Sequence, residues 1–188
     1  MSLDREVKCL KVLNDHKRSI TSVVSNDKLL VSASEDSTIK LYDLVTYTCV
    51  RTLGGFFNDH KKGVNCITLH GTTLISGSSD KTIKIWDTTD GHCMCTLDDH
   101  KDIIVSVAFN GSIVASSSPG GTIKIWEVGA PYKYIRTLEG HTNTVTGITF
   151  NDSVLISCSL DKTIKKSIYH EKYNLHSAFC HFNDPGQL

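Results

Sequence analysis

The sequence lacks several features that would place a protein in a class at once. It has no excess of charge, because 20 basic side chains balance 20 acidic ones among 188 residues. This balance removes the sequence-wide electrostatic argument for nucleic acid or an anionic membrane as a partner. No run approaches the ~20 apolar residues that a membrane helix needs, and Met1–Glu6 shows no signal-peptide pattern. We therefore expect a cytoplasmic protein, with the nucleus as the alternative, that engages no membrane and for which nucleic acid is disfavoured.

Chemical motifs are also scarce. The seven cysteines are odd in number and include no Cys-x-x-Cys, so a secreted disulfide framework is not indicated. The chain has no glycine-rich phosphate loop and no paired catalytic carboxylates. The arginines are too few and too dispersed for a phosphopeptide-reading cluster; they are Arg5, Arg18, Arg51 and Arg136. These absences predict a protein that is not an enzyme and that uses no cofactor.

What the sequence does contain is an internal repeat. Four histidines stand 44, 40 and 41 residues apart, at His16, His60, His100 and His141. Twenty residues after each comes a turn position, held by Asp36, Asp80, Gly120 and Asp161. Six residues further on stand Tyr42, Trp86, Trp126 and Ser167, and two residues before each turn position stand Ser34, Ser78, Ser118 and Ser159. Four copies in one register indicate four similar structural units.

Each copy has the pattern of β-strands. Short apolar or alternating runs, rich in β-branched residues, cover 64–69, 73–76, 82–86 and 92–97. Polar turn residues separate such runs, for example at 70–72 and 110–112. No segment has a convincing helical period. The predicted fold is all-β, with four antiparallel strands in each copy.

These features resemble the WD40 repeat of β-propellers. A length near 40 residues, the leading His and a closing Trp-Asp carry the resemblance; the closing pairs are Trp86-Asp87 and its variants Tyr42-Asp43 and Trp126-Glu127. The resemblance implies a propeller segment over 1–165, made of four four-stranded antiparallel blades at about 16–53, 60–97, 100–138 and 141–165. Residues 166–188 form a divergent tail. Val7–Leu13 matches the last strand of the other copies and is expected to be an additional outer strand.

The resemblance also implies a role for the repeated polar residues. In a WD repeat the Asp accepts a hydrogen bond from the His, which is linked through the Ser to the indole N–H. The predicted members of this structural network are His16, Ser34, Asp36 and Tyr42; His60, Ser78, Asp80 and Trp86; His100, Ser118 and Trp126; and His141, Ser159 and Asp161. A catalytic Ser-His-Asp triad is the competing interpretation, but a nucleophile site occurs once per domain, whereas this trio recurs.

Two cysteine- or histidine-rich segments are candidate metal sites. Cys93-Met94-Cys95 places both thiols on one strand face, but two soft ligands without a third make a poor zinc site. The tail carries His170, His176, Cys180 and His181, whose spacing matches no common zinc finger. We therefore predict no metal site.

The repeats depart from their own pattern at two places. An insertion, Gly-Gly-Phe-Phe at 54–57, lengthens one connecting loop, and its rings Phe56 and Phe57 either fold over the neighbouring blade or anchor a partner. In the fourth copy the pattern stops after Lys165, where Lys166 replaces the apolar residue of the other copies. This abrupt loss suggests a truncated or alternatively ended version of a longer propeller.

Four copies are fewer than the about seven blades with which propellers of this kind usually close. The two end blades of an open ring expose apolar faces. Three arrangements cover them: a four-bladed ring latched by Val7–Leu13, an eight-bladed ring of two copies, or a different chain that supplies further blades. We expect a partial or open propeller.

The implied function is that of a non-catalytic protein–protein interaction scaffold or adaptor. The alternative is a substrate-recruiting or regulatory subunit, or a severed domain, of a multi-domain kinase or ubiquitin ligase. Partners of WD40 proteins often dock on the loops before the first strand of each repeat; here these loops carry Lys17, Arg18, Phe56, Phe57, Lys61, Lys62, Lys101 and Asp102. The basic residues would steer an acidic partner, and a merely solvated, lysine-rich rim is the competing interpretation.

Overall fold

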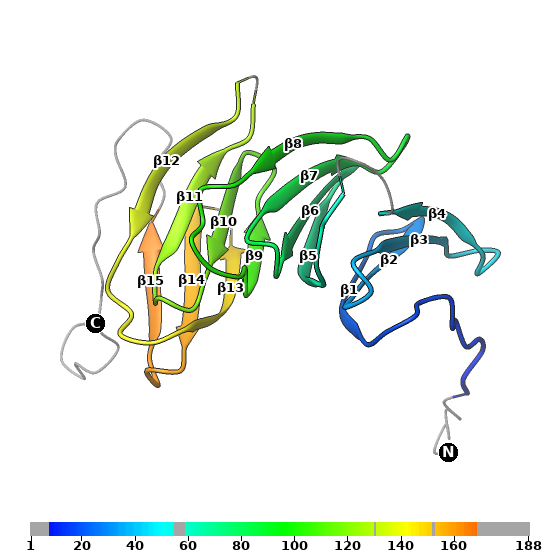
Figure 1. Ribbon diagram of the computed structural model, residues 1–188, viewed down its shortest axis with the longest axis horizontal. Coiled ribbons are helices and arrows are strands. Elements are labelled where there is room, and N and C mark those ends of the chain that lie inside the picture. Colours follow the sequence, from blue (N-terminus) through cyan, green and yellow to red (C-terminus); the bar gives the residue numbers. More distant parts are fainter. Residues whose placement is uncertain (1–7, 55–58, 130, 152, 169–188) are drawn as a thin grey trace, which may run out of the picture.

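The computed structural model describes residues 8–54, 59–129, 131–151 and 153–168. Within these residues, fifteen strands form four antiparallel sheets. Figure 1 shows the sheets fanned along an open arc, with the sheet of β1 near one end and the sheet of β15 near the other. The described residues contain no helix that is long and apolar enough to cross a membrane.

The four sheets share one meandering topology, in which consecutive strands are hydrogen-bonded neighbours. Sheet 1 contains β1 (Ile20–Ser25), β2 (Leu29–Ser34), β3 (Ile39–Asp43) and β4 (Cys49–Leu53). Sheet 2 contains β5 (Val64–His70), β6 (Thr73–Ser78), β7 (Ile83–Asp87) and β8 (Cys93–Leu97). Sheet 3 contains β9 (Ser106–Phe109), β10 (Ile113–Ser117), β11 (Ile123–Glu127) and β12 (Lys133–Leu138). Sheet 4 contains β13 (Val145–Asn151), β14 (Val154–Ser159) and β15 (Ile164–Ile168).

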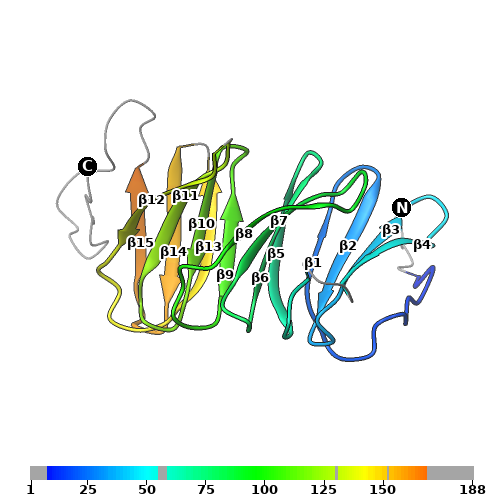
Figure 2. The same ribbon diagram turned by 45° about the horizontal axis from the view of Figure 1, so that its top comes forward.

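Short polar turns connect the strands, and they recur at the same repeat positions. The Asn26 side chain accepts hydrogen bonds from the backbone N–H groups of Lys28 and Leu29, which closes the turn between β1 and β2. Between β6 and β7, Lys81 adopts a φ of 74°, the left-handed conformation that a tight turn requires. The turns between the first and second strands of each sheet lie at one rim of the fan, and the turns between the second and third strands lie at the opposite rim. Figure 2 shows the strand ends of successive sheets side by side at these rims.

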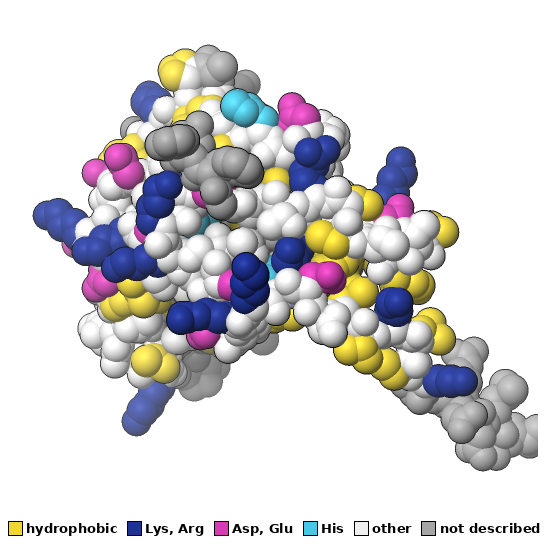
Figure 3. All heavy atoms as spheres, turned by 45° about the vertical axis from the view of Figure 1, so that its right-hand side comes forward, with side chains coloured by type: hydrophobic (Ala, Val, Ile, Leu, Met, Phe, Trp, Pro, Cys, Tyr) yellow, Lys and Arg dark blue, Asp and Glu magenta, His cyan; other side chains and the backbone are white. Residues whose placement is uncertain are grey.

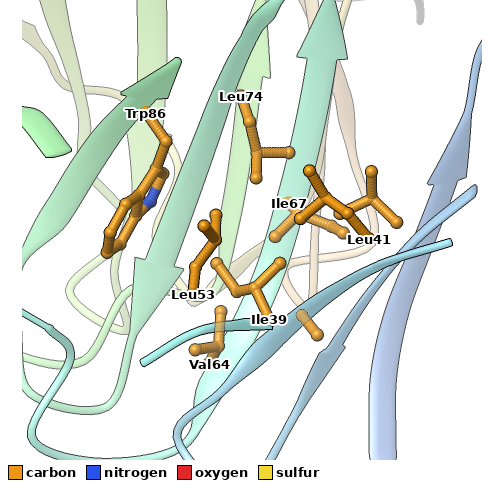
Figure 4. Close-up of a cluster of buried hydrophobic side chains, with 9 residues drawn as sticks. Ile39, Leu41, Leu53, Val64, Ile67, Leu74 and Trp86 are labelled. Atoms are coloured by element: carbon orange, nitrogen blue, oxygen red, sulfur yellow. The ribbon is translucent and has the colours of Figure 1, made fainter. Parts of the chain in front are cut away.

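Successive sheets pack face to face through apolar side chains. In the first joint the face of sheet 1 that turns toward sheet 2, its trailing face, contributes Val31, Ala33, Ile39, Leu41 and Leu53. The face of sheet 2 that turns toward sheet 1, its leading face, contributes Val64, Ile67, Leu74 and Trp86. Figure 4 shows these two sets of side chains interleaved between the sheets. Burying such side chains stabilises each joint by roughly 1.5–3 kcal/mol per large residue.

The other two joints repeat this packing. Between sheets 2 and 3, the trailing face supplies Ile75, Ile83, Ile85 and Leu97 and the leading face supplies Ile104, Val107, Val114 and Trp126. Between sheets 3 and 4 the cluster contains Ile113, Ala115, Ile123, Ile125, Leu138, Val145 and Leu155. Polar contacts link the inner strands as well, because Thr21 Oγ1 donates to Val64 O over 2.6 Å and Asn65 Nδ2 donates to Ile104 O over 2.7 Å.

The all-β, open propeller architecture predicted from the sequence is confirmed, with two differences. Sheet 4 has three strands within the described residues, where four were expected. Residues 8–13 of the predicted outer strand Val7–Leu13 form no strand, and Figure 1 shows this segment at the far end of the arc from β15. The charges in the repeat also disfavour pairing of this segment with β15. In sheets 1 and 3 the equivalent pairs are Leu41 with Arg51 and Ile125 with Arg136, so the same register would set Lys11 opposite Lys166. Like charges directly opposite each other destabilise a strand pair.

The fourth repeat continues further than its sequence suggests. The predicted boundary after Lys165 falls inside β15, which pairs with β14 in unbroken register as far as Val154 opposite Ile168. Backbone pairing does not depend on the side chain at each position, so the strand survives the substitution of Lys166 for an apolar residue. The sequence divergence therefore changes the exposed face of sheet 4 rather than its topology.

Candidate functional site

The polar residues that recur in each repeat form a buried hydrogen-bond network, which is complete in the second repeat. His60 Nδ1 lies 2.9 Å from Asp80 Oδ2, and His60 Nε2 lies 2.7 Å from Ser76 Oγ. The indole Nε1 of Trp86 donates to the same Ser76 oxygen over 2.8 Å. Thr82 Oγ1 donates to Asp80 Oδ1 over 2.7 Å. A neutral imidazole with its proton on Nδ1 satisfies every one of these groups.

The serine of this network differs from the predicted one. Ser76, not Ser78, joins the histidine to the indole, and Ser32, Ser116 and Ser157 occupy the same position in the other repeats. Strand pairing explains this, because Trp86 is opposite Leu74 and Ser76 is the next residue on the same face of β6. The spacing of ten residues between Ser76 and Trp86 in a hairpin was the sequence signal that would have identified it.

The serines that were predicted have a separate role in the turns. Ser78 Oγ donates to Gly63 O over 2.9 Å and accepts a hydrogen bond from the Asp80 backbone N–H. Ser34 and Ser159 make the equivalent contacts, with Arg18 O and Asn143 O as acceptors. These serines tie the turn of each sheet to the loop that enters it. Ser118 is buried at the same repeat position.

The network lowers the pKa values of both its histidine and its carboxylate, for different reasons. Burial lowers the pKa of His60, although the hydrogen bond and charge of Asp80 act against this shift. Burial favours the protonated form of Asp80, but hydrogen bonds from His60, Thr82 and the Lys61 backbone outweigh it and lower the pKa of Asp80 far below its usual value. The pair is therefore stable as a neutral imidazole beside a carboxylate near neutral pH.

The Asp80–His60–Ser76 arrangement has the atom order of a catalytic triad, yet its environment is that of a structural core. Ser76 is 0% exposed, so no substrate can reach its hydroxyl. Its oxygen also accepts the indole hydrogen bond of Trp86. The arrangement recurs in the first and fourth repeats, which favours the structural role over the catalytic one.

The first and fourth repeats retain most of the network. His16 and His141 contact Asp36 and Asp161 at 3.0 and 2.7 Å. At the indole position the first repeat has Tyr42, whose buried hydroxyl is hydrogen-bonded to Ser32 and Asp15. Burial raises the pKa of Tyr42. The fourth repeat has the buried Ser167 there and no indole donor.

The third repeat lacks the carboxylate. His100 Nε2 lies 2.7 Å from Ser116 Oγ, and Trp126 Nε1 donates to the same oxygen over 3.0 Å, but Gly120 stands where the other repeats have Asp. Burial, reinforced by the positive charge of Lys124, lowers the pKa of His100 to about 4. This histidine is therefore neutral near neutral pH.

The network carboxylates also position the loops predicted to bind a partner. Asp36 Oδ2 accepts a hydrogen bond from the Lys17 backbone N–H, and Asp80 Oδ2 accepts one from Lys61, each over 2.8 Å. The loops before β1 and β5 thus begin from fixed points at one rim of the fan, whereas the loop before β9 has no such anchor because Gly120 replaces the carboxylate. The exposed residues that the three loops carry are Lys17, Arg18, Lys61, Lys62, Lys101 and Asp102. Phe56 and Phe57 lie outside the described residues.

A hollow of about 390 Å³ opens at this rim of sheet 2. It is lined by Asp59, Lys61, Lys62, Ser79, Asp80, Lys81, Thr82 and Lys84. Four of these side chains are lysines, and the carboxylate of Asp80 already accepts hydrogen bonds from within the network. The four lysines outnumber the carboxylates of Asp59 and Asp80, so the lining of the hollow has a net positive charge.

The cysteines do not form a metal site in the part of the chain that the structure describes, where no group of three or more His, Cys, Asp or Glu side chains is placed to hold an ion. The prediction that Cys93 and Cys95 share a strand face is wrong, because Cys93 packs on the cluster between sheets 1 and 2 and Cys95 on the cluster between sheets 2 and 3. A β-bulge opposite them, between Ile85 and Trp86, turns the two thiols apart. His170, His176, Cys180 and His181 lie outside the described residues.

Antiparallel sheets that pack face to face around a common inner edge, each with a buried His–Ser contact that an indole joins in the second and third repeats, define the class of β-propeller repeat proteins. Comparison with protein families identifies the family described as "WD domain, G-beta repeat" in four segments, 7–43, 47–87, 91–127 and 132–166. The chain belongs to the WD40-repeat family. Comparison with curated protein sequences gives no match.

Solved structures share this fold. The computationally designed Ika4 protein is 28% identical with a TM-score of 0.77, covering 88% of this chain and 100% of its own. The RRP9 WD40 repeats are 26% identical with a TM-score of 0.78, covering 83% of this chain and 50% of their own. The computationally designed Ika8 protein is 29% identical with a TM-score of 0.72, and 82% of this chain matches 47% of it. The chain thus spans about half the length of the latter two.

Proposed function

We propose that this protein is a non-catalytic scaffold that holds an acidic protein partner at the rim of sheets 1 and 2. WD40 propellers are generally interaction modules, and the hollow at Lys61, Lys62 and Lys81 is the observation that carries the proposal for this chain. Figure 3 shows Lys and Arg side chains projecting over much of the face that it displays. A carboxylate-rich segment in the hollow would gain charge-assisted hydrogen bonds from the lysines.

The network makes this rim a rigid platform. The Lys61 backbone is held by Asp80, Lys81 Nζ donates to Lys101 O over 2.9 Å, and Lys84 Nζ donates to Thr96 Oγ1 over 2.7 Å. A partner therefore meets two cations, Lys81 and Lys84, whose side chains are already held in place, so that less conformational entropy is lost when these two groups bind. This pre-organisation distinguishes the hollow from lysines on a freely solvated surface.

A charge-reversal experiment tests the proposal. The probe is a fluorescent polyglutamate peptide, and its affinity is measured by anisotropy at two salt concentrations. The double variant Lys61→Glu/Lys62→Glu should lose about tenfold or more in affinity while its melting temperature stays unchanged, because both side chains are exposed.

The matched control is Lys28→Glu/Lys133→Glu, which makes the same change of charge with exposed residues at the opposite rim. This control should bind as the wild type does. Equal losses in both double variants would show only a response to net charge and would contradict the proposed site. Tighter binding of a single-stranded RNA probe than of polyglutamate would point to a different class of partner and would also contradict it.

A further inference from the structure

The two ends of the open arc expose sheet faces whose equivalents are buried in every internal joint. On the leading face of sheet 1, Ile20 is 51% exposed and Val23 is 55% exposed. Their repeat equivalents on sheet 2, Val64 and Ile67, are 0% and 5% exposed. Figure 3, with the sheet 1 end turned forward, shows hydrophobic side chains at the surface there. The leading face of sheet 1 is therefore one of the two apolar faces that a joint requires, without a neighbouring sheet to cover it.

The trailing face of sheet 4 is the other half. Ile164 is 57% exposed, whereas its equivalents Ile39, Ile83 and Ile123 are at most 4% exposed. Cys158 is also exposed there, at the position of Ala33 in sheet 1. One chain thus carries both halves of a further joint, at opposite ends of the arc (Figure 1).

The two exposed halves have departed from the repeat in a complementary way. In the first two joints an aliphatic residue packs in one cluster with an indole, Leu41 with Trp86 and Ile85 with Trp126. At the same two positions stand Lys166, which is exposed on sheet 4, and Tyr42, which is only 3% exposed on sheet 1 within the single chain. Tyr42 is hydrogen-bonded to the carboxylate of Asp15. A joint between these halves therefore brings an ammonium group to a phenol and a carboxylate.

We propose that a second copy of this chain covers both faces, with sheet 4 of each copy packed against sheet 1 of the other. Each chain offers one leading and one trailing face, so two copies make two equivalent head-to-tail contacts, which close a ring when each chain spans half a turn. Lys166 of one copy pairs with Asp15 of the other beside the Tyr42 ring. Burying Lys166 in an apolar joint costs desolvation energy, and pairing with a carboxylate offsets this cost. A partner blade with an indole and no carboxylate would leave the cost in place.

The ring has a consequence for the proposed function, although it does not depend on it. Two copies related by a twofold axis present the basic rim of sheets 1 and 2 twice. A partner with two acidic segments would then bind by avidity. Loss of the polyglutamate site through Lys61→Glu/Lys62→Glu should leave the assembly intact, so the two proposals fail separately.

Light scattering behind size exclusion on the full chain, at micromolar concentration, tests the assembly. The expected result is one compact species near twice 20.7 kDa. A compact monomer would overturn the proposal, because a monomer must cover its end faces with its own residues. A ladder of larger species would overturn it too, since it would show that the head-to-tail contact does not close.

Charge exchange tests the specific pairing. Lys166→Glu places a second carboxylate near Asp15 and should raise the dimer dissociation constant by about tenfold or more, whereas Lys28→Glu, at an exposed position outside both faces, should not change it. The double variant Asp15→Lys/Lys166→Glu restores opposite charges and should recover most of the affinity. A dimer that is insensitive to Lys166→Glu, or a double variant weaker than either single one, would overturn this joint.

Thiol protection gives an independent readout. Cys158 lies on the trailing face of sheet 4 and Cys49 on the outer strand of sheet 1, and both are exposed in the single chain. Alkylation of Cys158 should slow as protein concentration rises through the dissociation constant, while alkylation of Cys49 should not. Equal rates at all concentrations in a confirmed dimer would place the interface elsewhere.

Discussion

The indole Nε1 of Trp86 donates a hydrogen bond to Ser76 Oγ, 2.8 Å away on the neighbouring strand. The same oxygen lies 2.7 Å from His60 Nε2, so a single buried hydroxyl joins the outer part of the sheet to the loop that enters it. Through His60 and Asp80 the link reaches the Lys61 backbone at the rim. The network is therefore the means by which the core of a sheet fixes the position of a surface loop.

Removing this hydroxyl should have a specific effect. Ser76→Ala leaves the buried Trp86 indole without its acceptor, so the free energy of unfolding should decrease by roughly 1–3 kcal/mol. The indole N–H resonance of Trp86 should also shift in a proton–nitrogen NMR spectrum.

Ser78→Ala is the matched control for that spectrum, because Ser78 contacts Gly63 O and Asp80 N rather than the indole. It should lower stability without moving the Trp86 resonance. A shift of the resonance in Ser78→Ala, and none in Ser76→Ala, would restore the assignment first made from the sequence.

Installing the missing carboxylate should stabilise the third repeat. A side chain at Gly120 meets no atom within 4 Å of its Cβ, and Asp in this position accepts hydrogen bonds from the His in the other three repeats. Gly120→Asp should therefore raise the free energy of unfolding by about 1 kcal/mol, measured by urea titration at pH 7.

The adjacent glycine provides the contrast. Gly121 has a φ of 76°, similar to the 74° of Lys81, yet a Cβ there would lie 2.5 Å from His141 O. Gly121→Lys should therefore be destabilising by roughly 1–3 kcal/mol, although two other repeats have lysine at this position. Wild-type stability of Gly121→Lys would show that the loop of His141 moves away freely.

The lowered pKa of His100 should make the protein sensitive to mild acid. Between about 4 in the folded chain and the usual value of ~6.5 in the unfolded chain, the unfolded state binds a proton that the folded state does not. The free energy of unfolding should therefore decrease as the pH falls through this window. The pKa of His60 is also lowered by burial, so it contributes in the same direction.

The variant His100→Gln should remove the contribution of His100 to this pH dependence. That contribution is a decrease in the free energy of unfolding on the order of 2 kcal/mol between pH 7 and pH 4. The difference is measured as the change in urea midpoint between these pH values, with the exposed His92→Gln as control. A pH dependence as steep as that of the wild type would contradict a buried neutral His100.

A partly buried thiol and an exposed one should react at very different rates. Burial raises the pKa of Cys66 to about 12, while Cys49 is exposed. With iodoacetamide at pH 8, mass spectrometry should find Cys49 modified about 100-fold or more faster than Cys66. Cys66 should react at the rate of Cys49 only after denaturation. Comparable rates in the folded protein would mean that the joint between sheets 2 and 3 opens.

Gly77 lies in the joint between sheets 2 and 3, where a larger residue at this position would clash with its neighbours. A Cβ at Gly77 would lie 2.4 Å from Ile104 Cγ2 and 2.8 Å from Cys66 Sγ, although Ala33 is accommodated at the equivalent position of sheet 1. Sequence repetition alone would have suggested that alanine is equally suitable at both. The distances depend on how closely two particular sheets approach, which local patterns do not specify.

The sequence by itself determined the number of repeats, the strand character of each and the His–Asp half of the network, because strand periodicity and turn chemistry are local. The tertiary structure decided which serine completes the network, since Ser76 and Ser78 share a strand and only pairing with β7 brings one of them to Trp86. It likewise separated Cys93 from Cys95 through a bulge and formed no strand from residues 8–13. The exposure of Ile20 and Ile164 is also a tertiary result, because it depends on how far the three joints between four sheets carry the arc.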